Sequence, residues 1–460
     1  VKSPLSIGVP GTVRLLQHLH ARHGKLAWPE LFEPAIALAD AGFAVSPRLH
    51  TLLAGADPST FSMPARAYFF DAAGRPWPIG HRLANADYAR TLRLLARDGA
   101  SAFYRGPLAD AIVAAARVET ATAGSLTLDD LAGYRVEGRS PLCVIYRAHR
   151  VCTMGPPSSA GHAIAQVLGM IEPFSLGSAR GAAMSPGALH LMSEALRLAF
   201  ADRARYLADP AFVNVPMGLL DTGYLAERRR LIPALRPIAD PSPGTPPGLD
   251  RQAFAPDSTD EVAGTSHISV VDTEGNALAM TTTIEAAFGS GCWAAGFLLN
   301  NELTDFSFRP SMGGRPVANR IEPGKRPRSS MAPTIVLGPD RRLVAVLGSA
   351  GGARIIPYVL KPLVAVIDWK LDAASALALP NFGFRGRAFE LEEPQVGGLA
   401  GLRHPSGAIG ILSTALRLKL YNQDIQFAIL TSGTQLIVRR PDGALEGAAD
   451  PRREGVALGD

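Results

Sequence analysis

The pattern of apolar and polar positions changes near residue 265. Before that point, apolar residues recur at the spacing of one helical face, so residues 1–230 are predicted to be mostly helical. After it, short runs rich in β-branched residues predict strands. These predicted strands cover residues 265–272, 277–284, 334–338, 343–348, 434–440 and 444–447. The chain therefore combines a helical first part with a second part in which strands dominate.

The best-defined predicted helix begins at Ser185-Pro186, where a serine cap precedes a proline in the first turn. Asp209-Pro210 ends it, because proline disfavours the helical conformation in the residue before it. Between these limits runs a mostly apolar stripe, formed by Leu189, Met192, Leu196, Ala199, Arg203 and Leu207. A stripe at helical spacing usually packs, so we interpret it as core and not as a cofactor site.

Prolines and small polar residues concentrate between residues 233 and 256. This composition is typical of loops, and it predicts a disordered, mobile segment. The segment ends shortly before Thr265 and marks the clearest boundary in the chain. A mobile segment at this place would let two halves of the chain separate after a cut before Thr265.

Composition excludes several classes of protein. With 460 residues, 47% of them apolar and 19% charged, the chain is typical of a globular protein of one large domain or two or three smaller ones. It has no apolar run long enough to cross a bilayer. No nucleic-acid motif accompanies the net charge of +5. The densest basic run, Arg228–Arg230, is predicted to be the solvated face of a helix near Leu225.

Histidines and cysteines do not follow the spacing of a metal site, and no metal is predicted. Three histidines fall between residues 18 and 23 of a predicted helix, but they point in different directions and have no acidic or thiol partner nearby. Cys143 and Cys152 are predicted to be free buried thiols. A disulfide between them in an oxidising compartment is the alternative.

Thr265 heads a predicted β-hairpin. β-branched residues between 268 and 271 favour a strand, and residues 272–276 have the composition of a turn. If the chain folds about the centre of that turn, Thr265 faces either Thr283 or Ile284 on the returning strand. Directly opposed residues have Cβ atoms about 4.5–5.5 Å apart, so the Thr283 hydroxyl would reach that of Thr265.

A threonine freed by cleavage of the peptide bond before it can serve as nucleophile and base together. A cut between Gly264 and Thr265 would release the α-amine of Thr265, whose pKa would lie near about 7.7–8.0. That amine would accept the proton of the threonine's own hydroxyl, so no separate catalytic His or Asp is needed. The sequence therefore indicates a proenzyme that cuts itself before Thr265.

A glycine-rich turn follows the predicted strand 343–348. Its residues, Gly348-Ser349-Ala350-Gly351-Gly352, precede a helix predicted from Ala353, so bare N–H groups would be presented there. One interpretation is an oxyanion hole formed by Gly351 and Gly352. A phosphate loop is the rival, but the Lys and Ser/Thr of that motif are absent. A plain turn is the third interpretation.

Two polar loops offer complementary binding groups. Ser329 and Ser330, held between prolines, would donate hydrogen bonds to a carboxylate. Glu302 and Asp305, three residues apart in a turn, would bind an ammonium group. Either loop alone is explained by an ordinary polar surface. Together with an acyl-transfer threonine, they indicate a site for an α-amino acid whose side-chain carbonyl is attacked.

The ordered set of these motifs resembles the γ-glutamyltranspeptidase family of N-terminal-nucleophile hydrolases. The resemblance runs from Gly8 almost to the C-terminus. Its most specific motifs are Thr-Ser-His-x-Ser-Val-Val-Asp from Thr265, Phe-Gly-Ser-Gly from Phe288, Leu-Leu-Asn-Asn from Leu298, Lys-Arg-Pro-x-Ser-Ser-Met from Lys325 and Gly-Ser-x-Gly-Gly-x-Arg from Gly348. Coincidence is not a serious alternative for a set of this length and order.

The resemblance implies an α+β fold, the four-layer αββα sandwich of these hydrolases. It implies autocleavage into a heterodimer of residues 1–264 and 265–460. The implied roles are Thr265 as nucleophile, Thr283 as its hydroxyl partner, Gly351 and Gly352 as oxyanion hole, Glu285, Glu302 and Asp305 at the glutamyl amine, and Ser329 and Ser330 at its carboxylate.

The implied activity is cleavage of the γ-glutamyl amide of glutathione and other γ-glutamyl compounds, with water or an amino acid or peptide as acceptor and no cofactor. A related acylase, for glutaryl side chains of cephalosporins or for poly-γ-glutamate, is the second interpretation. Asp305 argues against a glutaryl substrate, which has no amine. The third interpretation is a non-enzymatic relic that is not cleaved.

The sequence departs from the family's pattern in three places. Family members normally carry a longer front with an arginine that pairs with the α-carboxylate, so a fragment with weaker carboxylate binding is expected. Residues 306–323 are expected to form a short lid loop that leaves the site open, and residues 292–297 a shortened pocket wall. The resemblance implies a periplasmic or extracellular location, with a cytoplasmic one as the alternative, because the sequence itself indicates no compartment.

Overall fold

The computed structural model describes residues 2–117, 126–178, 182–249, 254–259, 264–393 and 407–459. The chain forms two compact units. The first comprises residues 1–139 and 283–304, and the second comprises residues 140–282 and 305–460. Each expected cleavage fragment, 1–264 and 265–460, contributes to both units. The boundary between the expected fragments therefore does not coincide with the boundaries of the compact units. The cleavage into fragments stays a prediction.

The first unit is mainly helical. Its helices are α1 (Thr12–His23), α2 (Glu33–Ala41), α3 (Pro47–Ala54), α4 (Met63–Phe69), α5 (Ala86–Asp98), α6 (Ser101–Tyr104), α7 (Pro107–Ala115) and α8 (Leu128–Gly133). Its short strands are β1 (Phe43–Ala44), β2 (Arg82–Leu83), β7 (Trp293–Ala294) and β8 (Phe297–Leu298). Side-chain caps explain where several helices begin: Asn85 caps α5, and Thr127 forms a capping box with Asp130 at α8.

The second unit is built on a six-stranded antiparallel sheet with the order β17-β16-β12-β11-β4-β3. Its strands are β3 (Leu142–Tyr146), β4 (His149–Thr153), β11 (Thr334–Leu337), β12 (Leu343–Gly348), β16 (Gln435–Arg439) and β17 (Leu445–Ala449). Four of these six confirm strands predicted from the sequence. β3 and β4 lie in the part predicted to be helix and loop, and they were missed.

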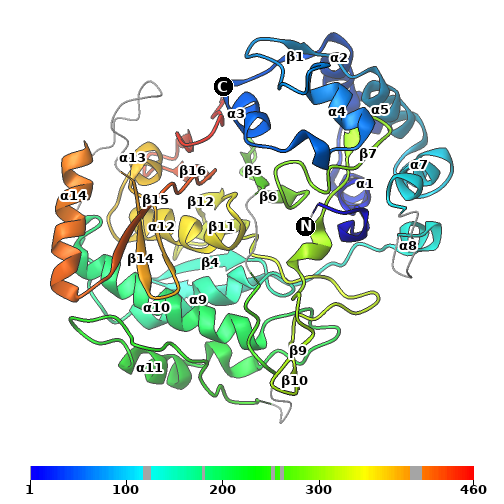
Figure 1. Cartoon of the computed structure of the whole chain (residues 1–460). Helices are drawn as coiled ribbons and strands as arrows, with labels where there is room; N and C mark the ends of the chain where they lie inside the picture. Colours follow the sequence, from blue (N-terminus) through cyan, green and yellow to red (C-terminus); the bar gives the residue numbers. More distant parts are fainter. Residues whose placement is uncertain are drawn as a thin grey trace. The chain divides into compact units, whose positions relative to one another are not determined.

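Helices of the second unit share one large apolar core with the sheet. They are α9 (Ala160–Ile171), α10 (Pro186–Tyr206), α11 (Thr222–Arg230), α12 (Ile355–Ile367) and α13 (Ala373–Ala378) (Figure 1). α9, α12 and α13 contact the sheet, and α10 and α11 pack on α9. Ser185 caps α10 as predicted, because its side chain accepts a hydrogen bond from the Ala188 N–H. The predicted stripe of α10 is buried along its whole length, so its interpretation as core is confirmed.

A second sheet, β5 (Thr265–Val271) and β6 (Ala277–Thr283), confirms the predicted hairpin. Successive residues of a strand point to opposite faces. In β12, Leu347 packs with the helices, whereas a Cβ added at Gly348 would lie 2.3 Å from the His267 ring of β5. The helices and β5 therefore cover opposite faces of the six-stranded sheet.

A further sheet in the second unit was missed by the sequence analysis. It consists of β13 (Phe382–Arg385), β14 (Ala388–Glu392) and β15 (Ile425–Ala428), and β14 and β15 run parallel. α14 (Gly407–Leu418) precedes β15, and a two-residue hairpin, β9 (Ser311–Met312) with β10 (Arg315–Pro316), occupies the predicted lid loop. Among the described residues, no helix combines the length and hydropathy that crossing a membrane needs.

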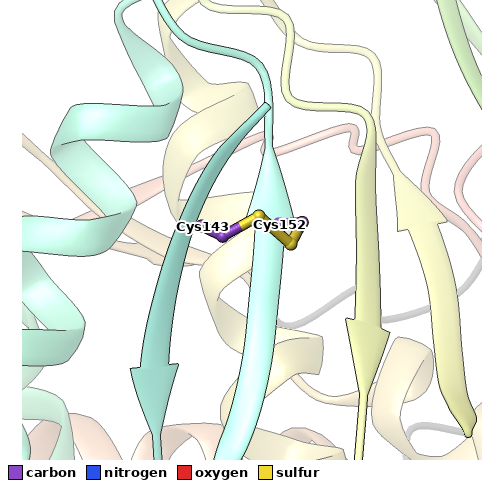
Figure 2. The surroundings of a disulfide bond; sticks show 2 residues. All are labelled: Cys143 and Cys152. Carbon is purple, nitrogen blue, oxygen red and sulfur yellow. A yellow bond between two sulfur atoms is a disulfide. The ribbon is translucent and has the colours of Figure 1, made fainter. Parts of the chain in front are cut away.

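Cys143 and Cys152 form a disulfide, so the prediction of two free thiols is wrong (Figure 2). The two residues face each other on the antiparallel strands β3 and β4, with Cα atoms 4.1 Å apart. The sequence analysis missed this hairpin and with it the reason for pairing. Disulfides persist in oxidising compartments, which agrees with a periplasmic or extracellular location. The location itself stays a prediction.

The described part of the proline-rich segment is held along α10, which differs from the expected disorder. The Tyr206 hydroxyl donates to the Gly244 carbonyl at 2.6 Å, and the Gly244 N–H donates to Asp202 at 2.8 Å. The Ile238 N–H donates to Glu194 at 2.7 Å. Polar groups buried on α10 thus satisfy the backbone of a segment that forms no regular structure. Residues 250–253 lie outside the described residues.

Arg228 is buried, so the prediction that the whole basic run is a solvated face is wrong. Its guanidinium lies 3.2 Å from the Asp202 carboxylate and donates to the Leu198 carbonyl at 3.0 Å. Arg230 is exposed, as predicted. Position on the helix decides the difference, because α11 packs one side against α9 and turns the other to solvent.

Candidate active site

Thr265 is the first residue of β5 and is buried. Its backbone carbonyl accepts a hydrogen bond from the Arg453 guanidinium at 3.2 Å. The same guanidinium donates to the Thr431 carbonyl at 3.1 and 3.3 Å. An arginine near the end of the chain therefore fixes the backbone at the predicted nucleophile.

His267 lies between the two strands of the hairpin and Gly348, the last residue of β12. Its Nδ1 lies 2.8 Å from the Thr281 hydroxyl and its Nε2 lies 3.1 Å from the Ser269 hydroxyl. His267 thus faces Thr281, which is the register in which Thr265 would face Thr283. The hydroxyl contact between those two threonines stays a prediction. Because Gly348 has no side chain, the imidazole packs directly on the strand that leads into the glycine loop.

Burial of His267 makes the stability of the fold sensitive to acid. Desolvation lowers the pKa of His267 to about 4, whereas an exposed histidine titrates near about 6.5. Between these values the unfolded chain binds a proton that the folded chain does not, so stability falls as the pH drops through this window. We expect His267→Gln to remove about 2 kcal/mol of the stability difference between pH 7 and pH 5.

Urea unfolding at both pH values measures this effect, in a Thr265→Ala background that is expected to keep the chain in one piece. His23→Gln, which changes an exposed histidine of α1, is the matched control. If His267→Gln loses as much stability on acidification as the control, the buried imidazole is not the acid-sensitive group.

The glycine loop has a backbone that only glycine adopts easily. Gly351 has φ +146° and Gly352 has φ +59°. A Cβ at Gly351 would also lie 2.6 Å from the Tyr358 ring. Ser349 anchors the loop, since its hydroxyl lies 3.0 Å from that of Thr434 and accepts from the Gly433 N–H at 3.3 Å. The Arg453 side chain that holds Thr265 packs against Gly433, so the glycine loop and Thr265 share one support.

Ser329 and Ser330 lie in a buried backbone pairing with residues 157–159. The Ser329 carbonyl accepts from both the N–H and the hydroxyl of Ser159, each at 2.7 Å. Arg203 of α10 donates to the Ser159 hydroxyl at 2.7 Å and to the Ser330 hydroxyl at 2.8 Å. The Ser330 oxygen accepts this bond, and the guanidinium places a positive charge beside the serine pair.

Glu302 and Asp305 lie at the two ends of one 3-10 turn (Glu302–Asp305). Side chains three residues apart lie on the same side of such a turn. The prediction that Glu302 and Asp305 bind one ammonium group requires this arrangement. Asp305 is buried, and its backbone carbonyl accepts a hydrogen bond from the Asn319 side chain at 2.7 Å.

Asn301 holds Glu285 and the backbone next to it in the first unit. Its side chain donates to the Glu285 carboxylate and accepts from the Ala286 N–H at 2.9 Å. Glu285 is buried and has φ +74°, a conformation that is strained for a side chain of this kind. The Thr283 hydroxyl accepts from the Glu285 N–H at 2.8 Å. Such strain is typical of functional sites.

The structure thus places the predicted residues in two local clusters. In the second unit, Thr265 and the glycine loop share the support of Arg453, and Asp305 and the serine pair are held by buried side chains. In the first unit, the Glu285 N–H donates to the Thr283 hydroxyl, and Asn301 donates to the Glu285 carboxylate. The sequence analysis missed the supporting residues Arg203, Asn301, Asn319 and Arg453. Two of them were within reach of the sequence: Arg203 is a charged residue in the apolar stripe, and Asn301 ends the Leu-Leu-Asn-Asn motif. Asn319 and Arg453 lie in none of the quoted motifs.

Comparison with solved structures defines the class of protein. The chain resembles the crystal structure of cephalosporin acylase from Bacillus halodurans, with a TM-score of 0.81 and 25% identity over 98% of this chain and 78% of that one. The fold is accordingly the predicted α+β sandwich of the N-terminal-nucleophile hydrolases.

Sequence comparison identifies the family. The family description of gamma-glutamyltranspeptidase matches residues 1–460. The chain is 35% identical to a glutathione hydrolase proenzyme of Escherichia coli (strain K12), over 98% of this chain and 74% of the relative. It is 34% identical to an acylase ACY 1 proenzyme of Pseudomonas sp. (strain SE83), over 98% of this chain and 75% of the relative. The chain belongs to the gamma-glutamyltranspeptidase family.

Proposed function

We propose that this protein cleaves itself between Gly264 and Thr265 and then acts as a γ-glutamyl hydrolase or transferase on glutathione-like substrates. The observation that carries the proposal is the position of Thr265. It begins a strand that packs on the six-stranded sheet beside the glycine loop, and Arg453 holds its carbonyl. Membership of the family and the glutathione hydrolase relatives support the choice of substrate.

In the proposed maturation, the Thr265 hydroxyl oxygen attacks the Gly264 carbonyl carbon. The peptide C–N bond breaks, the nitrogen takes a proton, and an ester links Gly264 to the threonine oxygen. Water then hydrolyses that ester, which regenerates the hydroxyl and leaves Thr265 with a free α-amine. The two fragments, 1–264 and 265–460, would remain together as a heterodimer.

In the proposed turnover, the α-amine accepts the hydroxyl proton as the Thr265 oxygen attacks the γ-carbonyl of the substrate. The Gly351 and Gly352 N–H groups stabilise the negative charge of the tetrahedral intermediate, and Thr283 donates to the nucleophile. The amide C–N bond breaks and the leaving amine takes the proton. Water, or the amine of an amino acid or peptide, then attacks the γ-glutamyl ester and frees the enzyme.

Substrate recognition in this proposal uses two opposite kinds of group. Glu285, Glu302 and Asp305 bind the α-amine of the glutamyl group. Ser329 and Ser330, the latter bonded to the charged Arg203, bind its α-carboxylate. The α-amine and the α-carboxylate of a γ-glutamyl substrate would both be bound. An acyl chain that lacks one of them, such as glutaryl, would use only part of the site.

A related acylase is the second candidate, because relatives of similar identity and the neighbouring structure carry acylase names. Activity on glutaryl anilide that equals or exceeds activity on γ-glutamyl anilide would favour it. A denaturing gel tests the third candidate, an uncleaved relic, because an enzyme of this kind gives two bands and a relic gives one.

Asp305→Asn tests recognition of the amine. Removing the carboxylate charge loses a hydrogen bond to a charged group, worth about 1.5–3 kcal/mol. We expect KM for γ-glutamyl anilide to rise about ten- to a hundredfold, while cleavage at Thr265 is unchanged because Asp305 is not proposed to contact the scissile peptide. Steady-state kinetics on γ-glutamyl and glutaryl anilides measures the effect.

The glutaryl substrate is the internal control, since it lacks the amine and should tolerate the substitution relatively well. Asp340→Asn, at an exposed acid outside the proposed site, is the matched control variant. Equal losses on both anilides would show that Asp305 does not bind the amine.

A further inference from the structure

A buried polar node around Asn319 connects the two binding loops of the second unit. Asn319 is fully buried. Its amide nitrogen donates to the Asp305 carbonyl at 2.7 Å, and its amide oxygen accepts from the Arg328 N–H at 2.9 Å. Asp305 belongs to the proposed amine site, and Arg328 directly precedes Ser329 of the proposed carboxylate site. One amide therefore fixes the backbone of both loops.

A carboxylate from the other expected fragment completes the node. Asp257 accepts from the Asn319 amide nitrogen at 3.1 Å and from the Arg328 guanidinium at 3.0 Å. The side chains of Asp257 and Arg328 are almost inaccessible to solvent. Burial alone would raise the pKa of Asp257, but Arg328 and the hydrogen bonds to Asp257 hold its pKa below the usual range. The Asp257 carboxylate is thus charged and bound on both sides.

The segment that carries Asp257 is itself anchored next to these loops. The Ala255 N–H donates to the Pro316 carbonyl at 2.9 Å, and the Asp257 N–H donates to the Ala204 carbonyl at 2.9 Å. Phe254 packs in a small apolar cluster with residues of both expected fragments, including Ala318. A cut after Gly264 would leave these contacts in place on the second unit.

We propose that Asp257 is a positioning residue, which holds Asn319 and Arg328 and through them sets the distance between the amine and carboxylate sites. This inference rests on the proposed function, and it adds that the substrate clamp is assembled from both cleavage fragments. The residue does not touch the substrate, and it acts through the backbone of Asp305 and of the Ser329–Ser330 loop. A clamp that loses its spacing binds an α-amino acid more weakly, because the ammonium and the carboxylate of the ligand can no longer both meet their hydrogen-bond partners at good geometry.

Asp257→Asn in the full-length protein tests the proposal, since it removes the charge and keeps the shape. Asp240→Asn is the matched control, an exposed acid on the same proline-rich segment. Calorimetry measures binding of L-glutamate to the purified protein, and kinetics measures KM and kcat on γ-glutamyl anilide. We expect normal self-cleavage, binding of L-glutamate and KM each weakened about tenfold, and kcat within about threefold of the unchanged protein.

The possible results distinguish failure of the positioning role of Asp257 from failure of the proposed function. Binding within about twofold of the unchanged protein, or a fall of kcat as large as that of affinity, overturns the positioning role and leaves the proposed function standing. If the unchanged protein neither binds L-glutamate nor turns over γ-glutamyl anilide, the proposed function fails and this inference fails with it. Should Asp257→Asn not fold, Asp257→Ala with Arg328→Leu removes both charges together, which buried pairs tolerate better than loss of one. That double variant is expected to show the same weakened binding, and unchanged affinity in it overturns the proposal.

Discussion

Thr265→Ala is expected to leave a single full-length chain with no measurable turnover of γ-glutamyl anilide. The hydroxyl is the group proposed to attack the Gly264 carbonyl, so its removal stops maturation at the first bond-forming step. Without that cut, no free α-amine exists to act as base. Nucleophile and base are lost together, which makes this the largest effect expected of any single substitution here. A denaturing gel and an activity assay measure both parts.

Thr265→Ser is the matched variant, because serine keeps the hydroxyl and, once cleaved, the α-amine. It should mature into two bands and retain part of the activity. Two bands from Thr265→Ala would show that another residue performs the cleavage. A single band from both variants would show that a hydroxyl at this position is not sufficient for the cleavage.

The hairpin at Thr265 shows what a sequence can predict about such a site. Its strands and turn follow from local residue preferences, and the observed register, with His267 facing Thr281, follows from the length of the turn. The glycine loop was predictable for the same reason, since positive φ at Gly351 and Gly352 needs glycine. The strands, the turn and the glycine conformations depend on neighbouring residues in the sequence, and for that reason they could be predicted.

The supporting residues depend on contacts that are distant along the chain. Arg203 reaches Ser330 across 127 positions, and Arg453 reaches Thr265 across 188. Nothing in the spacing of the sequence brings these pairs together. The prediction of two free thiols was wrong for a related reason. The pairing of Cys143 with Cys152 follows only once β3 and β4 are known to form a hairpin. Tertiary packing, and not residue preference, places these groups.

Arg203 also bears on how the α-carboxylate is bound. The sequence analysis expected weak carboxylate binding, because the arginine that family members use for it was not found. In the structure, the buried Arg203 donates to the Ser330 hydroxyl and to the Ser159 hydroxyl, which in turn donates to the Ser329 carbonyl. A positive charge therefore supports the two neutral donors. How strongly the α-carboxylate is bound stays a prediction.

Arg203→Met is accordingly expected to raise KM for γ-glutamyl anilide about ten- to a hundredfold, from loss of about 1.5–3 kcal/mol of charge-assisted binding. Activity on 4-aminobutyryl anilide, which keeps the amine but lacks the carboxylate, should change much less, and kinetics on the two substrates measures the difference. Arg205→Met, two residues further along α10 and outside the serine pair, controls for loss of an arginine from that helix. Arg203→Lys should recover part of the affinity, since it keeps the charge and loses the planar fork. Equal losses on both anilides would mean that Arg203 supports the fold of the serine loop and does not contribute to recognition of the carboxylate.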